Sequence, residues 1–444
     1  MLLSIAELLV ILAIVMLMGV DCFMAIRSRS WVQIYRPTLF IAVVLAFYVL
    51  VGPLRAILAT GELPNFAETS GTIYRGLDHR PFLFWGWLGA LVFYGSLLGG
   101  FYGLPSRMSP RRLMIRVDSR RIQRWGQGLC ASGLLMYAIV NGGRLVSLLN
   151  PFSPQRLGED FLGIAGLNVG PFENYFQLAI NLLIPGVLIQ FTVWLRQRRG
   201  LWGICLWLII AALIFLSETF RYRILLLVVP MLLLWLFYYK RRPRLIFILA
   251  FMVSFVALNG VVGLSRTHLR GLDLARTAQY SPLQVFASSF EEASVFLTTS
   301  AVFDVVPSKL PFVGFEPLKT AFLQPIPRAF LLSKPSGEYS QSVREEIYKT
   351  PRSFTAYLNY AEYYLIWGWP TLVAGGLGLG WLLRRLWNWF LCRQYEPLAQ
   401  AVYLLNASYL YVVVSRGYFP QVVMLYAFSV LPSILVYWRV SQKI

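Results

Sequence analysis

Four short stretches of the sequence combine charged and polar side chains that could carry chemistry. The first is residues 217–223, SETFRYR, in which Arg221 and Arg223 follow Glu218 closely. Planar guanidinium groups can hold a phosphate or a carboxylate through paired hydrogen bonds. The same side chains could instead extend to the polar boundary of a membrane, as arginine near the end of an apolar helix commonly does. We interpret the pair as a candidate anion site.

The second stretch, SRTHLR at residues 265–270, follows an apolar run directly. Arg266 and Arg270 are four residues apart and share one face if the helix continues, with His268 beside that face. His268 is a candidate proton acceptor, although a lone histidine can equally be a satisfied structural residue. Arg266 and Arg270 are candidate anion ligands.

The third stretch, residues 325–339, is rich in proline and carries Arg328, Lys334, Glu338 and Tyr339. Proline fixes extended backbone around the two cations, and Gly337 permits a turn just before Glu338. Rigid backbone that displays two cations and an acid is typical of a binding loop. An ordinary proline-rich surface loop would have the same composition.

The fourth stretch, residues 352–364, interleaves Arg352, Tyr357, Asn359 and Tyr360 with Glu362. Aromatic faces stack on sugar rings, and polar groups bond sugar hydroxyls. The tyrosines could also form an aromatic belt at a membrane interface. Glu362 is the better clue, because a carboxylate next to an apolar span is costly unless it is paired or faces a cavity.

Common catalytic motifs are absent, and a transition-metal site is not expected. The chain has two histidines and four cysteines, none at zinc-like spacing, and no phosphate-binding glycine loop or hydrolase motif occurs. Two adjacent acid pairs, Glu291-Glu292 and Glu345-Glu346, could bind a divalent ion or simply be solvated. We predict no metal and no cofactor.

The composition indicates which elements must position these residues. The 444-residue chain is 57% apolar and only 14% charged, with a mean hydropathy of +0.61. These values exclude a soluble enzyme, a disordered chain and a nucleic-acid-binding domain. An all-α polytopic membrane protein of about 11 transmembrane helices is predicted. The expected spans are residues 3–23, 38–59, 81–101, 125–140, 175–195, 201–216, 224–239, 245–264, 369–383, 397–414 and 421–437.

The basic residues predict the orientation of these spans. The short connections on one side hold 22 basic residues and those on the other hold eight. Since cytoplasmic loops carry the excess of lysine and arginine, we expect the N-terminus outside and the C-terminus in the cytoplasm. The net charge of +20 is then almost entirely an orientation signal. We predict a single membrane-embedded domain, 1–444, with one large exoplasmic loop at 265–367.

Three of the stretches resemble a known family, the O-antigen or oligosaccharide repeat-unit polymerases. The resemblance covers roughly residues 201–383 and includes the Ser217-x-x-x-Arg221 turn. It also includes the proline-arginine-lysine stretch from Ile326 to Pro335 and the Glu-x-Tyr-x-x-x-Gly pattern from Glu362 to Gly368. One departure is that some members carry paired Arg-x10-Gly motifs. Neither Arg221, Arg266 nor Arg328 has a glycine at that spacing.

The resemblance implies a metal-independent membrane glycosyltransferase of the GT-C type in the bacterial inner membrane. Its substrates would be polyprenyl-diphosphate-linked oligosaccharides within membrane lipid. A chain-length regulator and a flippase of the same pathway would be its partners. It would not bind nucleic acid. It would transfer the growing glycan from its carrier to the sugar of an incoming repeat unit.

The chemistry of such a transfer is consistent with the residues. Clustered cations can stabilise a diphosphate leaving group, and a carboxylate with a raised pKa can act as general base. We therefore predict Arg221, Arg223, Arg266, Arg270, Arg328 and Lys334 as diphosphate ligands, and Glu362, Glu338 or His268 as the base. Tyr339, Arg352, Tyr357, Asn359 and Tyr360 are the predicted sugar contacts.

Two other functions remain open at this level. An O-antigen ligase-like transferase would move a completed glycan to a different acceptor and would differ only in its acceptor pocket. A lipid or polysaccharide flippase or transporter belongs to another class, and such proteins tend to have internal repeats and ionisable residues deep in their spans. Glu7 and Arg55 are the only charges set well inside the apolar runs, and no repeat is evident.

Overall fold

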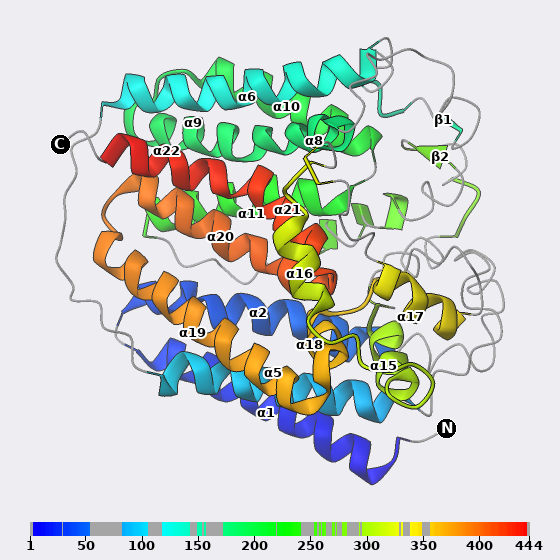
Figure 1. Cartoon of the computed structure of the whole chain (residues 1–444). Coiled ribbons are helices and arrows are strands. Elements are labelled where there is room, and N and C mark those ends of the chain that lie inside the picture. The colour runs from blue at the N-terminus through cyan, green and yellow to red at the C-terminus, as the bar shows by residue number, and fades with distance from the viewer. Residues whose placement is uncertain are drawn as a thin grey trace.

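The protein, in a computed structural model, is a bundle of helices that run side by side (Figure 1). The start of α1 and the end of α22 lie at opposite ends of this bundle (Figure 1). The structure describes residues 3–28, 30–53, 82–104, 118–142, 149–152, 155–156, 172–218, 220–240, 253–254, 257–258, 260–262, 269–270, 272, 278–281, 293, 295–327, 330–331, 338–348 and 356–441.

The helices of the described chain are joined by turns and connections, and its strands are one antiparallel pair of two residues each, β1 (Gln155–Arg156) and β2 (Leu269–Arg270). The first half contains α1 (Ile5–Arg27), η1 (Trp31–Tyr35), α2 (Pro37–Ala46), η2 (Phe47–Val51), α5 (Leu83–Gly103), α6 (Ser119–Asn141), α8 (Glu173–Leu178), η7 (Ala179–Leu182), α9 (Leu183–Gln197), α10 (Leu201–Ser217) and α11 (Arg221–Tyr238). The second half contains α15 (Val295–Val305), α16 (Glu316–Leu323), α17 (Glu338–Tyr348), α18 (Asn359–Trp367), α19 (Trp369–Arg393), α20 (Pro397–Ser415), α21 (Phe419–Ser429) and α22 (Leu431–Ser441).

The predicted all-helical class is confirmed, and the membrane class is supported by the length and apolarity of the helices. Five helical segments of the described chain can cross a bilayer: α1, α5, the continuous run 173–197, α11 and α20. A sixth arises if α21 and α22, bent by 42° where they meet, count as one span. The count of eleven spans and the orientation stay predictions. The expected span 245–264 lies mostly outside the described residues.

Small residues let α5 and α19 pack closely. A Cβ added at Gly100 would lie 2.1 Å from the Leu377 carbonyl oxygen, and one at Gly380 would lie 2.0 Å from the Leu97 carbonyl oxygen. No side chain larger than hydrogen fits at either position while the helix backbones keep this separation. In lipid, where apolar surface gains little by leaving the solvent, such close backbone contact is a principal source of helix association.

A buried polar network joins α1 to α5 and to the start of α2. Asp21 on α1 is fully buried and accepts hydrogen bonds from Tyr94 at 3.1 Å and Tyr102 at 2.5 Å. Arg36 lies 3.7 Å from the same carboxylate and also bonds Tyr102. A buried carboxylate without partners is strongly unfavourable, and these contacts satisfy it. Asp21 therefore adds an acidic residue inside a candidate span, and its contacts join α1 to α5 and to the start of α2.

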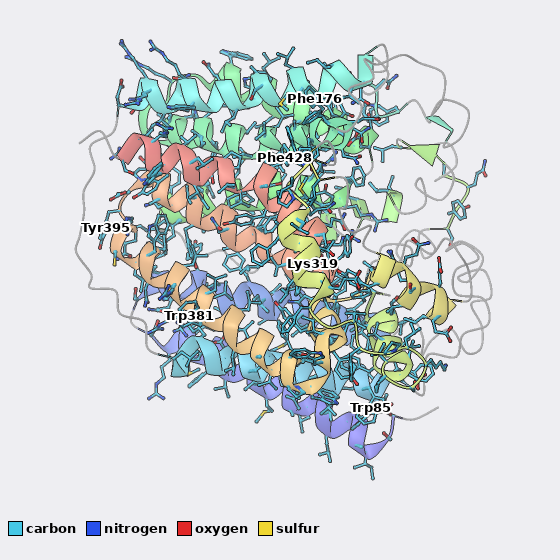
Figure 2. All side chains as sticks on the ribbon, in the orientation of Figure 1. Trp85, Phe176, Lys319, Trp381, Tyr395 and Phe428 are labelled. Atoms are coloured by element: carbon cyan, nitrogen blue, oxygen red, sulfur yellow. The ribbon has the colours of Figure 1, made fainter. Side chains whose placement is uncertain are left out.

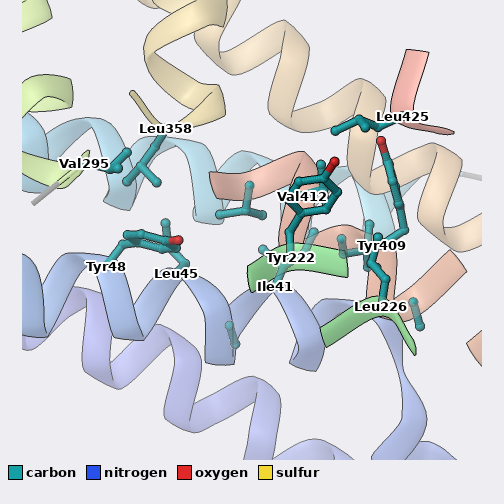
Figure 3. Packing of buried hydrophobic residues seen from close by; sticks show 14 of the residues in the cluster. Ile41, Leu45, Tyr48, Tyr222, Leu226, Val295, Leu358, Tyr409, Val412 and Leu425 are labelled. Atoms are coloured by element: carbon teal, nitrogen blue, oxygen red, sulfur yellow. The ribbon is translucent and has the colours of Figure 1, made fainter. Parts of the chain in front are cut away.

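Part of the long segment 265–367 folds back onto the bundle. α15 is buried along nearly its whole length and packs on α5, where a Cβ at Gly86 would meet the Ser300 side chain at 2.0 Å. Figure 1 places α15, α17 and α18 together at the end of the bundle where α1 begins, with α16 lying across α21. Figure 3 shows Val295 of α15 and Leu358, just before α18, packed beside Tyr48 in the common core. Helices from this segment therefore pack against the long helices at one end of the bundle.

Candidate active site

Glu362 lies in the first turn of α18, at the end of the bundle where α15 and α17 meet the long helices. Its helix starts after the extended residue Leu358, whose amide donates to Thr299 Oγ1 at 2.7 Å. It ends at Gly368, where φ is +74° and an L side chain would be strained. A carboxylate in a first turn is stabilised by the helix dipole. The Leu358 contact and Gly368 fix where α18 starts and ends, and therefore where Glu362 lies.

Two groups from distant parts of the chain hold one oxygen of this carboxylate. Glu362 Oε1 accepts from the Tyr339 hydroxyl of α17 at 2.6 Å and from the Phe419 backbone amide of α21 at 3.2 Å. The other oxygen, Oε2, is buried and forms no hydrogen bond with the residues that the structure describes. Glu362 itself is fully buried. The carboxylate is thus oriented through Oε1, and Oε2 is available to accept a proton.

Tyrosines surround the carboxylate. Tyr357 is almost completely buried and interacts electrostatically with Glu362. Tyr418 packs against Tyr339, with the ring centroids 5.9 Å apart. Burial and the negative charge of Glu362 raise the pKa of Tyr339, so that its hydroxyl remains a donor. The carboxylate therefore sits among hydrogen-bonding phenols and apolar ring faces.

Burial raises the pKa of Glu362 to about 7. The hydrogen bonds from Tyr339 and Phe419, and the positive charge of Arg344 on α17, act in the opposite direction without cancelling the effect of burial. Arg344 is positioned through its Nε, which donates to the Ser340 carbonyl oxygen at 3.0 Å. A carboxyl group of this pKa exchanges its proton near neutral pH, as a general acid or base requires.

Gly417 allows the corner between α20 and α21 to approach this site. Its amide donates to the Tyr357 carbonyl oxygen at 2.7 Å, and an added Cβ would lie 2.6 Å from the Leu358 carbonyl oxygen. The close contact places Tyr418 and the Phe419 amide against Glu362. Sequence reasoning missed Gly417, Tyr418, Phe419 and Arg344. The run RGYFP at residues 416–420, with glycine and tyrosine inside a very short connection, is the signal that could have indicated the corner.

The predicted pair Arg221 and Arg223 forms a second buried cluster at the start of α11, where the two side chains are 5% and 4% exposed. Arg223 forms an ion pair with Glu218 and donates from Nε to the Tyr222 hydroxyl at 3.2 Å. Tyr137 donates to the other oxygen of Glu218 at 2.6 Å. The charge of Arg223 is thus already compensated within the protein.

The second cluster is connected to Glu362 through α20 and α21. Tyr222 packs beside Tyr409 of α20 (Figure 3), and the Tyr409 hydroxyl donates to the Val422 carbonyl oxygen at 2.6 Å. Val422 is three residues along α21 from Phe419, whose amide bonds Glu362. The two clusters are therefore linked through Tyr409 of α20 and through α21.

Two of the remaining predicted residues, Tyr360 and Asn359, lie on α18. Tyr360 is fully buried on the opposite face of α18, and its hydroxyl donates to the Gly86 carbonyl oxygen at 3.1 Å, so its contacts are those of a packing residue. Asn359 is 1% exposed at the first position of α18. The backbones of Glu338 and Arg270 begin α17 and end β2. Arg266, His268, Arg328, Lys334 and Arg352 lie outside the described residues.

Comparison with protein-family models, with curated proteins and with solved structures finds no match to this chain.

Proposed function

We propose that the protein is a glycosyltransferase of the bacterial inner membrane that polymerises lipid-linked oligosaccharide repeat units. The growing glycan passes from its polyprenyl-diphosphate carrier to a sugar hydroxyl of an incoming repeat unit at the outer face of the membrane. Glu362 carries this proposal. It is a buried carboxyl group with a pKa of about 7, oriented by Tyr339 and the Phe419 amide, in a chain whose helices suit a membrane.

In the proposed reaction, the acceptor hydroxyl attacks the anomeric carbon of the donor glycan. A new carbon–oxygen bond forms as the bond from that carbon to the diphosphate breaks, and the polyprenyl diphosphate leaves with the bonding electrons. The hydroxyl proton moves to Glu362 Oε2. Tyr339 keeps Oε1 in place during the transfer, so that no reorientation of the base is needed.

The developing charge on the diphosphate must be stabilised where it forms. Arg344 is the described cation whose charge reaches Glu362. Arg221 remains a proposed ligand of the diphosphate, together with Arg266, Arg270, Arg328 and Lys334. Arg223, in its ion pair with Glu218, instead holds the start of α11 in place.

The proposed sugar contacts are Tyr339 on α17, Tyr357 just before α18 and Asn359 on α18. Arg352 is proposed with them. Aromatic side chains beside the base suit the stacking and hydroxyl recognition of a saccharide. Tyr360 is left out, because its ring is fully buried against Phe93 of α5 and its hydroxyl donates to the Gly86 carbonyl oxygen.

The direct test uses the purified protein in nanodiscs with lipid-linked repeat units and reads chain extension as a ladder on a gel. We expect the wild-type protein to make the ladder and Glu362→Gln to lose roughly 10²- to 10⁴-fold of the rate, since one general base contributes about that much. Glu345→Gln is the matched control on α17, where Gln341 bonds the partly exposed carboxylate. It should leave the rate unchanged.

The outcomes separate the proposed function from its alternatives. A wild-type protein that extends no chain but glycosylates a different, added acceptor is a ligase. One that moves lipid-linked glycan between leaflets without forming a bond is a transporter. A fully active Glu362→Gln protein would show that another group is the base. The buried Asp21 is not an argument for a transporter, because its carboxylate accepts hydrogen bonds from Tyr94 and Tyr102 and lies 3.7 Å from Arg36.

A further inference from the structure

A cavity of about 370 Å³ lies at the end of the bundle opposite Glu362. Its lining comes from the connection before η1, the ends of α9 and α11, and the connection between α19 and α20. Tyr395, one of the lining residues, marks this end in Figure 2, at the far side of the molecule from Trp85. A volume in this range is that of a small-molecule site. The Glu362 site does not use this cavity.

Two exposed cations from different helices line the cavity. Arg196 lies in the last turn of α9, and Lys240 follows the end of α11. Within the part of the chain that the structure describes, neither takes part in an ion pair, and no carboxylate lines the cavity. Glu396, the nearby acid, lines a smaller adjoining pocket that shares Arg196 and Pro397 with this cavity, and its carboxylate accepts from the Tyr437 hydroxyl at 2.8 Å. The electrostatics of the cavity favour an anion.

The backbone at Lys240 supports a role for its side chain. Lys240 adopts φ of +50°, in the left-handed region, at the point where α11 ends. A non-glycine residue costs about 1 kcal/mol or more in this conformation, and glycine would avoid the cost. A lysine at this position therefore supplies a charge at the expense of backbone energy.

A buried acceptor without a partner adds a second requirement on the ligand. Gln400 lines the cavity and is 8% exposed, and its Nε2 donates to the Gln394 carbonyl oxygen at 2.6 Å. Its Oε1 has no hydrogen-bond partner among the described residues. A buried acceptor left without a donor costs about 1–3 kcal/mol. A ligand that carries a hydroxyl or ammonium donor beside its anionic group would satisfy it.

Aromatic side chains also line the cavity. Trp31 and Phe237 pack with their centroids 4.7 Å apart, and both line the cavity together with the exposed Tyr395. Tryptophan and tyrosine concentrate at membrane interfaces, and basic pockets between spanning helices on the cytoplasmic side bind anionic headgroups. The predicted orientation places this end in the cytoplasm.

We infer that this cavity binds a phosphate-bearing anion, namely the headgroup of an anionic phospholipid such as phosphatidylglycerol. Arg196 and Lys240 contact the phosphate, and Gln400 accepts from a headgroup hydroxyl. The inference does not depend on the proposed function. The basic residues at this end therefore form a ligand site as well as an orientation signal.

The test compares delipidated protein in detergent with added phosphatidylglycerol, phosphatidylcholine of the same chain length, or inorganic phosphate. Binding is read by native mass spectrometry and by the midpoint of thermal unfolding. We expect phosphatidylglycerol to bind and to raise the midpoint more than phosphatidylcholine does. Arg196→Gln combined with Lys240→Gln should weaken that binding at least roughly tenfold, because two charge-assisted contacts are lost.

Two control variants separate a local effect from general loss of charge or of folding. Arg439→Gln removes an exposed cation at the end of α22 and should leave binding within about twofold of the wild type. Arg196→Lys combined with Lys240→Arg keeps both charges and should retain the preference for phosphatidylglycerol.

Other outcomes would change the ligand or overturn the inference. If inorganic phosphate raises the midpoint of the wild type but not of the double glutamine variant, the cavity is still a phosphate site and its source is a soluble ligand. If both phospholipids bind equally, or if Arg439→Gln weakens binding as much as the double variant does, the inference is wrong.

Discussion

The proton affinity of Glu362 depends on a balance between burial and its hydrogen-bond donors. Burial raises its pKa to about 7, and the Tyr339 hydroxyl is the strongest of the groups that lower it. The Phe419 amide and Arg344 add to that lowering. The contact that orients the base therefore also keeps enough of it ionised at neutral pH to accept a proton.

Removing the Tyr339 hydroxyl should therefore shift the pH dependence of transfer. Tyr339→Phe takes away a donor that stabilises the ionised carboxylate, so the pKa of Glu362 rises above about 7. The base is active when deprotonated, so the acidic limb of the rate profile moves to higher pH, by roughly one unit for the loss of one such hydrogen bond. The measurement is the chain-extension rate from pH 5 to pH 9. A profile that does not move, or one that moves to lower pH, would contradict this role for Tyr339.

At the scale of elements, the corner between α20 and α21 determines the geometry of the site. Gly417 contacts the backbone before α18, and the two residues after it supply Tyr418 and the Phe419 amide. α21 then continues to Val422, which accepts from Tyr409 beside the Arg221 cluster. A small displacement of this corner would disturb both clusters together.

Gly417→Ala is the variant that displaces the corner. The new Cβ would lie 2.6 Å from a carbonyl oxygen and 2.6 Å from the Tyr357 ring, neither of which can retreat freely. We expect a loss of about 1–3 kcal/mol of stability, as for other overpacked sites, and a large fall in chain extension. Gly378→Ala on α19 is the control, because nothing lies within 4 Å of its added Cβ. Thermal unfolding of the two variants provides the comparison, and equal midpoints would show that the corner tolerates the change.

At the scale of the whole molecule, the two sites lie at opposite ends of the bundle. Glu362 lies at the end where α1 begins, and the cavity with Arg196 and Lys240 lies at the other end. The proposed transfer needs the first end outside the cytoplasm, where lipid-linked repeat units are joined. The predicted orientation agrees with that requirement.

Labelling of single cysteines tests this orientation. Starting from a variant without the four native cysteines, Gln341→Cys on α17 should react with a membrane-impermeant maleimide in intact spheroplasts, because Gln341 is exposed at the end of the bundle that is predicted to lie outside. Arg439→Cys, exposed near the end of α22, should react only after the membrane is opened. The reverse pattern would show that the inserted protein has the opposite orientation and would place Glu362 in the cytoplasm.

The long apolar runs of the sequence were enough to predict the all-helical class and several of the helices. Bilayer thickness requires long apolar runs, and these survive in any fold, so the runs at 3–23, 81–101, 175–195 and 397–414 correspond closely to α1, α5, the segment 173–197 and α20. Glu362 could also be identified as a candidate site residue from the sequence, because a carboxylate beside an apolar span is costly unless it is paired or faces a cavity.

The contacts around Glu362 could not be predicted from the sequence, because they depend on how distant helices pack. Tyr339, Glu362 and Phe419 are separated by 23 and 57 residues along the chain, and no local pattern encodes their contact. The approach of the corner depends on the missing side chain of Gly417, and the raised pKa of Glu362 depends on burial by α17, α18 and α21 together. Helical periodicity fixes which face of a helix is apolar. Which partner covers a carboxylate depends on packing between distant helices, and that packing sets both its proton affinity and its orientation.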